Sequence, residues 1–243
     1  MGKTIIQQAR GHGSLTYRVR RKAFLHRIKY PTTSETQGEG VVLKLIHSGG
    51  HSAPIAKIKT GNIFFYNLAS SKMYEGQKIK IGVKNNFEMG DIVTLENLPT
   101  KTYVYNIESN PNDGGKFIKT AGSSGFITKK EGDKIWIMMP SKKEKVFNSK
   151  CRASIGIIAG SGRNEKPIVK AGRMWFIKKT KNKLWPRTSA VKFNAIDHPF
   201  GSGRGKNLTH GRLGKIPRRN SPPGAKVGSL RARRTGKGKG GIK

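Results

Sequence analysis

The sequence predicts a mostly β protein in which two consecutive small barrels lie between two basic arms. Three observations support this prediction. Short runs of β-branched residues alternate with polar residues through the centre of the chain, and Gly and Asn separate them. Residues 38–160 show no convincing amphipathic helix. The positive charge is concentrated at the ends, because residues 1–34 hold eight basic and no acidic residues, and residues 166–243 hold twenty-two basic residues and one acid.

The strands are expected at runs of three to seven residues with period-two alternation. The first set lies at residues 41–46, 55–59, 63–66 and 78–83, and the second at residues 91–95, 102–107, 126–128, 134–138, 145–147 and 155–158. Strands this short at this spacing are typical of small barrels rather than βαβ units. We expect the barrels to meet near residues 87–90. Residues 171–176 fit either a short helix or one last strand.

The C-terminal residues 194–243 form a cationic arm. They hold thirteen Lys and Arg, eleven Gly and four Pro, and no acid follows Asp197. Such a segment buries too little apolar surface to offset its ordering entropy, so it is expected to order only on a polyanion. For the isolated chain, we expect order only between about residues 37 and 190.

The composition favours nucleic acid as the partner. Forty-nine basic against thirteen acidic residues give a formal net charge of +36, which excludes an ordinary charge-balanced enzyme. No apolar run is long enough to span a bilayer, and the N-terminus lacks a signal-peptide core, so no membrane partner is expected. The single cysteine, Cys151, excludes an internal disulfide and a multi-cysteine zinc site.

Several motifs suggest chemistry without completing it. Residues 201–206 resemble a phosphate loop, but Asn207 stands where Ser or Thr is required. His47 and His51 flank a glycine turn and lack further ligands in sequence, so surface histidines are favoured. Cations beside Cys151 favour a lowered thiol pKa, whereas a buried structural thiol is the commoner case.

Asp197 and His198 form the one pair with a catalytic appearance. An Asp can orient an imidazole that acts as a general base, but neighbours in sequence need a turn to meet, and Pro199 fits such a turn. The favoured interpretation is that Asp197 caps the local backbone and His198 binds a phosphate or base. Among the aromatic residues, Trp175 and Trp185 are the better candidates for base stacking. Alternation favours the core for Tyr103, Tyr105, Phe117, Phe126, Trp136 and Phe147.

From Asn194 to Gly201 the sequence resembles the universal family of large-subunit ribosomal protein two. Further matching stretches follow the family's order along almost the whole chain: Gly2-Lys3, residues 6–11, Gly114-Gly115, Ala121-Gly122, residues 151–153, residues 170–172 and residues 233–236. Residues 221–224 resemble the archaeal and eukaryotic members. Two departures are Phe200, where bacterial members usually carry a second His, and a changed glycine run at residues 201–205.

The resemblance implies an oligonucleotide-binding-type barrel at residues 37–88 and an SH3-like barrel at residues 89–175. Basic extended regions then occupy residues 1–36 and 176–243. It also implies a cytoplasmic, non-enzymatic protein of the large ribosomal subunit that binds ribosomal RNA and supports assembly. Implied partners are that RNA, neighbouring large-subunit proteins and the small subunit at a bridge. The tail is expected to reach toward the peptidyl-transferase region. No cofactor is expected beyond RNA-associated Mg²⁺.

The expected RNA contacts are cations of the arms and motif stretches, together with two tryptophans and the Asn194–His198 stretch. They are Arg10, Arg18, Arg20, Arg21, Arg152, Arg163, Lys170, Arg173, Trp175, Trp185, Arg187, Asn194, Asp197, His198, Arg204, Lys206, Arg218, Arg219, Arg231, Arg233 and Arg234. Two competing functions stay open. One is a histone-like or general single-strand binder, and the other is assistance to peptide-bond formation by His198.

Overall fold

The computed structural model describes residues 3–32, 38–83 and 85–202, together with Asn220, Pro222, Gly224 and Val227. The chain divides into two compact units. One unit, Arg20–Lys181, contains the barrels and is called the barrel unit. The other combines Met1–Val19 with Asn182–Lys243 and is called the terminal unit. In the described part of the chain, no helix is long and apolar enough to cross a membrane.

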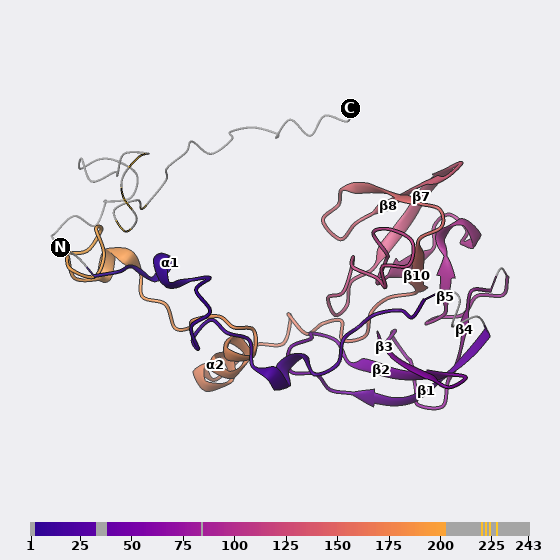
Figure 1. Ribbon diagram of the computed structural model, residues 1–243, viewed down its shortest axis with the longest axis horizontal. Coiled ribbons are helices and arrows are strands. Elements are labelled where there is room, and N and C mark those ends of the chain that lie inside the picture. The colour runs from indigo at the N-terminus through magenta and orange to yellow at the C-terminus, as the bar shows by residue number, and fades with distance from the viewer. Residues whose placement is uncertain are drawn as a thin grey trace. The chain divides into compact units, whose positions relative to one another are not determined.

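Within the barrel unit, the described residues form a ten-stranded sheet (Figure 1). Its strands are β1 (Gly38–Ile46), β2 (Ile55–Thr60), β3 (Ile63–Leu68), β4 (Lys78–Ile81), β5 (Ile92–Thr94), β6 (Tyr103–Tyr105), β7 (Gly125–Glu131), β8 (Lys134–Met138), β9 (Glu144–Asn148) and β10 (Arg152–Ile155). The order across the sheet is β3-β2-β1-β4-β5-β10-β6-β7-β8-β9. Short 3₁₀ turns are η1 (Arg21–Phe24), η3 (Leu95–Asn97) and, in the terminal unit, η4 (Ala190–Lys192).

The predicted mostly β class is confirmed, and the arrangement is consistent with an oligonucleotide-binding-type barrel followed by an SH3-like barrel. Strands β1 to β4 pair antiparallel as one set, and β5 to β10 pair antiparallel as the other. The sets join through one parallel pair, Ile81 opposite Ile92. Beside this joint, the carboxylate of Asp91 accepts the N–H groups of Lys80 and Glu88, both at 2.8 Å. Burial raises the pKa of Asp91. The predicted barrel boundaries stay predictions.

Two apolar cores lie inside the barrel unit, and each takes residues from both strand sets. The first contains Val42, Ile58 and Ile79, and also Ile92 of β5. The second contains residues from Val93 to Ile158, and also Ile55 and Leu68 of β2 and β3. Because Ile55 and Leu68 are fully buried in the second core, each barrel completes part of the other's interior.

One strand differs from its sequence prediction. We expected the last strand at residues 155–158, whereas β10 is Arg152–Ile155. All four of its residues are buried, because β10 lies between β5 and β6 in the middle of the sheet. The sequence Arg152-Ala153-Ser154-Ile155 does alternate between polar and apolar residues. It is only four residues long, however, and Ile155 is its one residue of high strand propensity, so the local pattern is too weak to predict a strand.

Residues 28–30 pack into the barrels, although the sequence placed them in the N-terminal arm. Ile28 and Tyr30 are buried, one in each core. Lys29 forms a bridge with Tyr66 of β3, and the Tyr30 N–H donates to the carbonyl of Gly114 at 3.0 Å. The Tyr30 hydroxyl lies 2.6 Å from that of Ser154. This end of the arm is thus tied to both barrels.

A buried ion pair holds the same region together. Arg152 is 4% exposed and Glu108 is 0% exposed, and Arg152 Nη2 donates to Glu108 Oε1 at 2.7 Å. Glu108 also accepts the backbone N–H groups of Arg152 and Gly114, at 2.9 and 3.0 Å. Arg152 Nη1 donates to the carbonyl of Pro31 at 2.7 Å. Each charge therefore has several hydrogen bonds, which is the condition under which a buried pair is tolerated.

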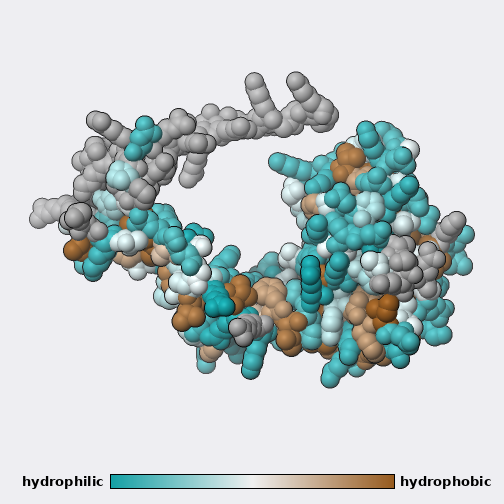
Figure 2. Space-filling model, in the orientation of Figure 1, coloured by the Kyte–Doolittle hydropathy of each residue, from teal (hydrophilic) through white to brown (hydrophobic). Residues whose placement is uncertain are grey.

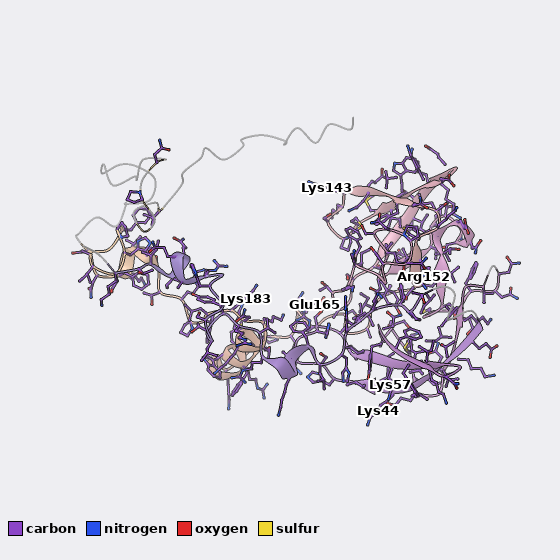
Figure 3. The ribbon with its side chains drawn as sticks, in the orientation of Figure 1. Lys44, Lys57, Lys143, Arg152, Glu165 and Lys183 are labelled. Atoms are coloured by element: carbon purple, nitrogen blue, oxygen red, sulfur yellow. The ribbon has the colours of Figure 1, made fainter. Side chains whose placement is uncertain are left out.

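This arrangement argues against the predicted contact between Arg152 and RNA. Its guanidinium lies inside the barrel unit, where Figure 3 labels it, and it is occupied by Glu108 and Pro31. The sequence gives no local sign of this pairing, because Glu108 lies forty-four positions before Arg152. Arg152 therefore resembles a surface cation in the sequence.

Removing one member of the pair is expected to destabilise the barrel unit strongly. Glu108→Gln leaves the Arg152 guanidinium buried without its counter-charge, so the free energy of unfolding should fall by about 3–5 kcal/mol. Urea denaturation of the full chain measures this. The matched control is Glu131→Gln, which breaks the exposed Lys129–Glu131 pair and should cost less than about 1 kcal/mol. Equal losses in the two variants would contradict a stabilising role for the buried pair.

Candidate nucleic-acid interface

Eight of the cations predicted to contact RNA have described side chains, and all of them except Arg152 lie at the surface. Arg10, Arg18, Arg20, Arg163, Lys170, Arg173 and Arg187 are all exposed. Among the described residues, no carboxylate forms an ion pair with any of these seven. In the barrel unit the surface in view is mostly hydrophilic, with apolar residues in small patches (Figure 2). These charges are therefore available to an external anion.

Part of the predicted set falls outside the described residues. This applies to the side chain of Arg21 and to the tail cations Arg204, Lys206, Arg218, Arg219, Arg231, Arg233 and Arg234.

The stretch at residues 171–176, left open between helix and strand, begins the helix α2 (Ala171–Thr180). Lys178 and Lys179 lie in its last turn, where cations favour the negative end of the helix dipole. Asn182 follows with φ 57°, the left-handed conformation common just after a helix. All ten residues of α2 are described, and none is buried.

The aromatic residues of α2 are exposed beside cations. Trp175 is 36% exposed and Phe176 is 63% exposed. Lys179 Nζ lies 4.0 Å from the centroid of the Trp175 ring. Because residues 174–177 are consecutive and apolar, their side chains surround the helix instead of sharing one face. A helix this short is marginal alone, so α2 presents cations and aromatic rings suited to a partner that encloses it.

In the terminal unit, Asn194 to Ser202 form a compact turn around His198. The Asn194 carbonyl accepts the N–H groups of Asp197 and His198, at 3.0 and 3.2 Å. The Ser202 N–H donates a hydrogen bond to the carbonyl of Phe193 at 3.0 Å, which closes the turn. A Cβ on Gly201 would collide with the carbonyl oxygens of Phe193 and Asn194. Glycine is thus required at position 201 for space.

His198 is held in one tautomer by this turn. The N–H of Phe200 donates to His198 Nδ1 at 3.0 Å. Since a backbone amide is always a donor, Nδ1 is the acceptor and the neutral ring carries its proton on Nε2. His198 is 9% exposed, and burial lowers its pKa. The rings of Phe193 and Phe200 lie 6.1 and 5.2 Å away between centroids.

Asp197 binds the N-terminal segment. Its Oδ1 lies 3.3 Å from Lys3 Nζ, and the Lys3 N–H donates to the carbonyl of Ile196 at 2.8 Å. Among the described residues, the imidazole of His198 forms a hydrogen bond with the backbone N–H of Phe200 and none with Asp197. Asp197 therefore does not serve as the orienting acid that a catalytic pair needs.

A pocket of about 280 Å³ lies against this turn within the terminal unit. It is lined by Lys3, Arg187, Phe193, Asp197 and His198, together with residues 4–7, Thr188 and Ala190. Ile5 is buried and directly precedes the short helix α1 (Ile6–Ala9). Sequence analysis did not assign Lys3 to the site, because no local pattern links it to a residue almost two hundred positions away. Trp185 is half-buried, and Asn194 is exposed.

The aromatic residues expected in the core differ in burial. Tyr105 and Phe147 are buried in the second core, and Phe117 packs against it. The expectation is wrong for Tyr103, which is 50% exposed, and Phe126 and Trp136 are half-buried. The thiol of Cys151 is buried, which raises its pKa to about 11.

Among the described residues, no cluster of three His, Cys, Asp or Glu side chains is arranged to hold a metal. His51 Nδ1 lies 2.8 Å from the Ser48 hydroxyl.

Comparison with known proteins gives consistent matches. A family model for the C-terminal domain of ribosomal proteins L2 matches residues 88–220. The large ribosomal subunit protein uL2 of Archaeoglobus fulgidus is 41% identical over 239 residues, which cover 97% of this chain and 99% of that protein. The protein of the same name from Methanocella arvoryzae is 42% identical over 98% of this chain and 100% of its own length. That of Korarchaeum cryptofilum is 37% identical over 98% and 97%.

The turn around His198 should open when Gly201 acquires a side chain. In Gly201→Ala the added methyl group displaces the carbonyls of Phe193 and Asn194, so His198 becomes hydrated and its pKa rises toward about 6.5. Proton NMR titration of the histidine ring measures this. Gly172→Ala is the matched control, because a Cβ there meets open space. A lowered His198 pKa that survives in Gly201→Ala would contradict the proposed packing.

The same pKa gives a direction for pH dependence. Because the folded pKa of His198 lies below its unfolded value, the unfolded turn binds more protons in the interval between them. The neutral ring therefore stabilises the turn fully above about pH 6.5, and this contribution is lost as the pH falls through the folded pKa.

Proposed function

The chain belongs to the uL2 family of large-subunit ribosomal proteins, and from this premise we propose that it acts by binding ribosomal RNA through its cationic segments. It has a structural role in the ribosome, in the cytoplasm. The observation that carries the proposal is the stretch from Lys166 to Ile196, which contains nine basic and no acidic residues. Most of its cations are exposed, and no described carboxylate forms an ion pair with Lys170, Arg173 or Arg187.

The chemistry of these segments fits RNA. Exposed guanidinium and ammonium groups bind phosphate through charge-assisted hydrogen bonds. Aromatic rings such as Trp175 stack on unpaired bases, which are the parts of RNA that proteins reach most easily. A general polyanion binder would need only the charge. The combination of cations with exposed rings on α2 favours folded RNA, in which phosphates and unpaired bases occur together.

We further propose that the cationic tail supports assembly of the subunit and reaches toward the peptidyl-transferase region, with the small subunit as an additional partner at a bridge. The tail has the charge to enter RNA, since its thirteen basic residues all follow Ser202. A histone-like or general single-strand binder is the competing function. It is distinguished by sedimentation, because a ribosomal protein stays with large subunits after a high-salt wash and a general binder dissociates.

Catalysis by His198 is disfavoured. A general base needs an unprotonated ring nitrogen directed at the substrate, and the only such nitrogen of His198 accepts the Phe200 amide. Burial lowers the pKa of His198, and no described carboxylate offsets this by contacting the ring. Its fixed Nε2–H is instead a hydrogen-bond donor, suited to a phosphate or base acceptor.

The tail should supply much of the RNA affinity. Truncation after Ser202 removes thirteen cations and keeps the turn around His198. Each phosphate contact that is lost reduces the slope of log affinity against log salt by about 0.7 to 0.9. The slope for ribosomal RNA fragments should therefore flatten by several such increments. An unchanged slope would mean that the tail does not contact phosphate.

Replacement of His198 should leave peptide-bond chemistry nearly intact. His198→Gln preserves a side-chain donor and acceptor but cannot exchange a proton near neutral pH. Large subunits with complete RNA and protein content are measured in single turnovers across a range of pH. We expect near-normal rates per assembled particle, with any loss confined to assembly or subunit joining. A decrease of about 100-fold or more, with loss of a titration near neutrality, would establish a general-base role instead.

A further inference from the structure

The outer face of β2 and β3 carries an exposed phenylalanine beneath two lysines. Phe64 is 52% exposed. Lys57 Nζ and Lys59 Nζ lie 5.0 and 5.8 Å from the centroid of its ring. Both distances are within the range in which an ammonium group is attracted to an aromatic face.

The strand register explains why these side chains meet. Lys59 is opposite Phe64 on β3 and Val41 on β1, while Lys57 is opposite Tyr66 and Lys44. Since alternate residues of a strand share a face, Lys57, Lys59 and Phe64 project together. A bulge between Val42 and Lys44 leaves both Leu43 and Lys44 exposed on the same strand. Figure 3 shows Lys44 and Lys57 on these neighbouring strands. We call Lys44, Lys57, Lys59 and Phe64 the β1–β3 cluster.

The face is closed at one end and open at the other. At its closed end, Ile55 and Leu68 pair with each other and are buried in the second core. The next pair, Lys57 and Tyr66, is half-buried, and the last, Lys59 and Phe64, is exposed. The second barrel therefore covers only part of this sheet face. Exposed apolar groups on the remainder, Val41, Leu43 and Phe64, are typical of an interaction surface.

The charge of the open end selects the partner. Within the described residues, no carboxylate pairs with Lys44, Lys57 or Lys59. The neighbouring acids lie at the β4 margin and are engaged: Glu39 is 3.5 Å from Lys78 Nζ, and Glu75 accepts the Leu45 N–H at 2.8 Å. Two ammonium groups over one ring repel each other, and a polyanion would relieve this repulsion.

We propose that the β1–β3 cluster is a stacking platform for an unpaired base of single-stranded RNA. Phe64 stacks on the base, and Lys57 and Lys59 move from the ring to the flanking phosphates, with Lys44 extending the path across β1. This inference rests on the RNA-binding function proposed above and adds a site within the first barrel. RNA is favoured over a protein partner, because a ring flanked by cations on a sheet face offers no apolar pocket for a protein anchor.

The test measures protection of individual lysines in the full-length protein. Amine acylation of Lys57 and Lys59 is followed by peptide mass spectrometry while single-stranded oligouridylate is added. We expect Phe64→Ala to raise the RNA concentration for half-protection of these lysines by about 5- to 150-fold, the loss of one stacked base. Half-protection of Lys178 and Lys179 on α2 should not change. Phe64→Trp should restore protection, and Tyr74→Ala, at another exposed aromatic residue (64% exposed), should leave it unaltered.

Heparin serves as a polyanion without bases, and Phe64→Ala should not alter the heparin concentration needed for protection. Protection of the α2 lysines by RNA without protection of Lys57 and Lys59 would overturn the platform and leave RNA binding intact. Absence of protection at every lysine would overturn both. Equal half-protection in wild type and Phe64→Ala would remove the stacking role. In assembled large subunits, protection of Lys57 and Lys59 that persists after RNA digestion would show that a protein covers the face and would also overturn it.

Discussion

The buried pair of Glu108 and Arg152 is the interaction on which the barrel unit depends. Two opposite charges removed from water are tolerable only when every lone pair and proton finds a partner. Those partners come from separate parts of the chain: the Gly114 loop, the backbone of β10 and the carbonyl of Pro31. The pair therefore fixes the point at which the N-terminal arm leaves the barrels. The pair also neutralises one cation inside a protein with a net charge of +36, in which like charges repel one another.

The two units place cations and aromatic groups in different settings. On α2 and in the β1–β3 cluster, rings are exposed beside lysines whose ammonium groups can move to phosphate. Around His198, rings are packed inside a turn whose hydrogen bonds fix the imidazole. The first arrangement adapts to a partner, whereas the second presents one donor in a set direction. RNA recognition commonly combines such elements, since phosphate contacts position the protein and base contacts discriminate.

Much of the fold was predictable, because period-two alternation marks strands that are exposed on one face. It failed at β10, where Arg152-Ala153-Ser154-Ile155 does alternate but is only four residues long and contains a single residue of high strand propensity. Long-range pairings such as Lys3 with Asp197 left no local signal, and the tautomer of His198 depends on a backbone amide that only the folded turn supplies. Phe64 could have been found, since it shares a strand face with Tyr66 and follows two alternating lysines. The number of cations in the tail predicts a nucleic-acid-binding function from composition alone, but composition does not reveal which groups each cation contacts.

The exchange of apolar residues between the two cores has a consequence for synthesis. Domains generally fold from the N-terminus as the chain emerges. Here the first barrel reaches its full set of strands, β1 to β4, while Ile55 and Leu68 still lack the residues beyond Val93 that cover them. The nascent chain therefore exposes the apolar side chains of Ile55 and Leu68, beside the lysines of β2, while tens of further residues are added. Such an intermediate exposes apolar surface to chaperones and to other RNA until the second core is complete, at Ile158.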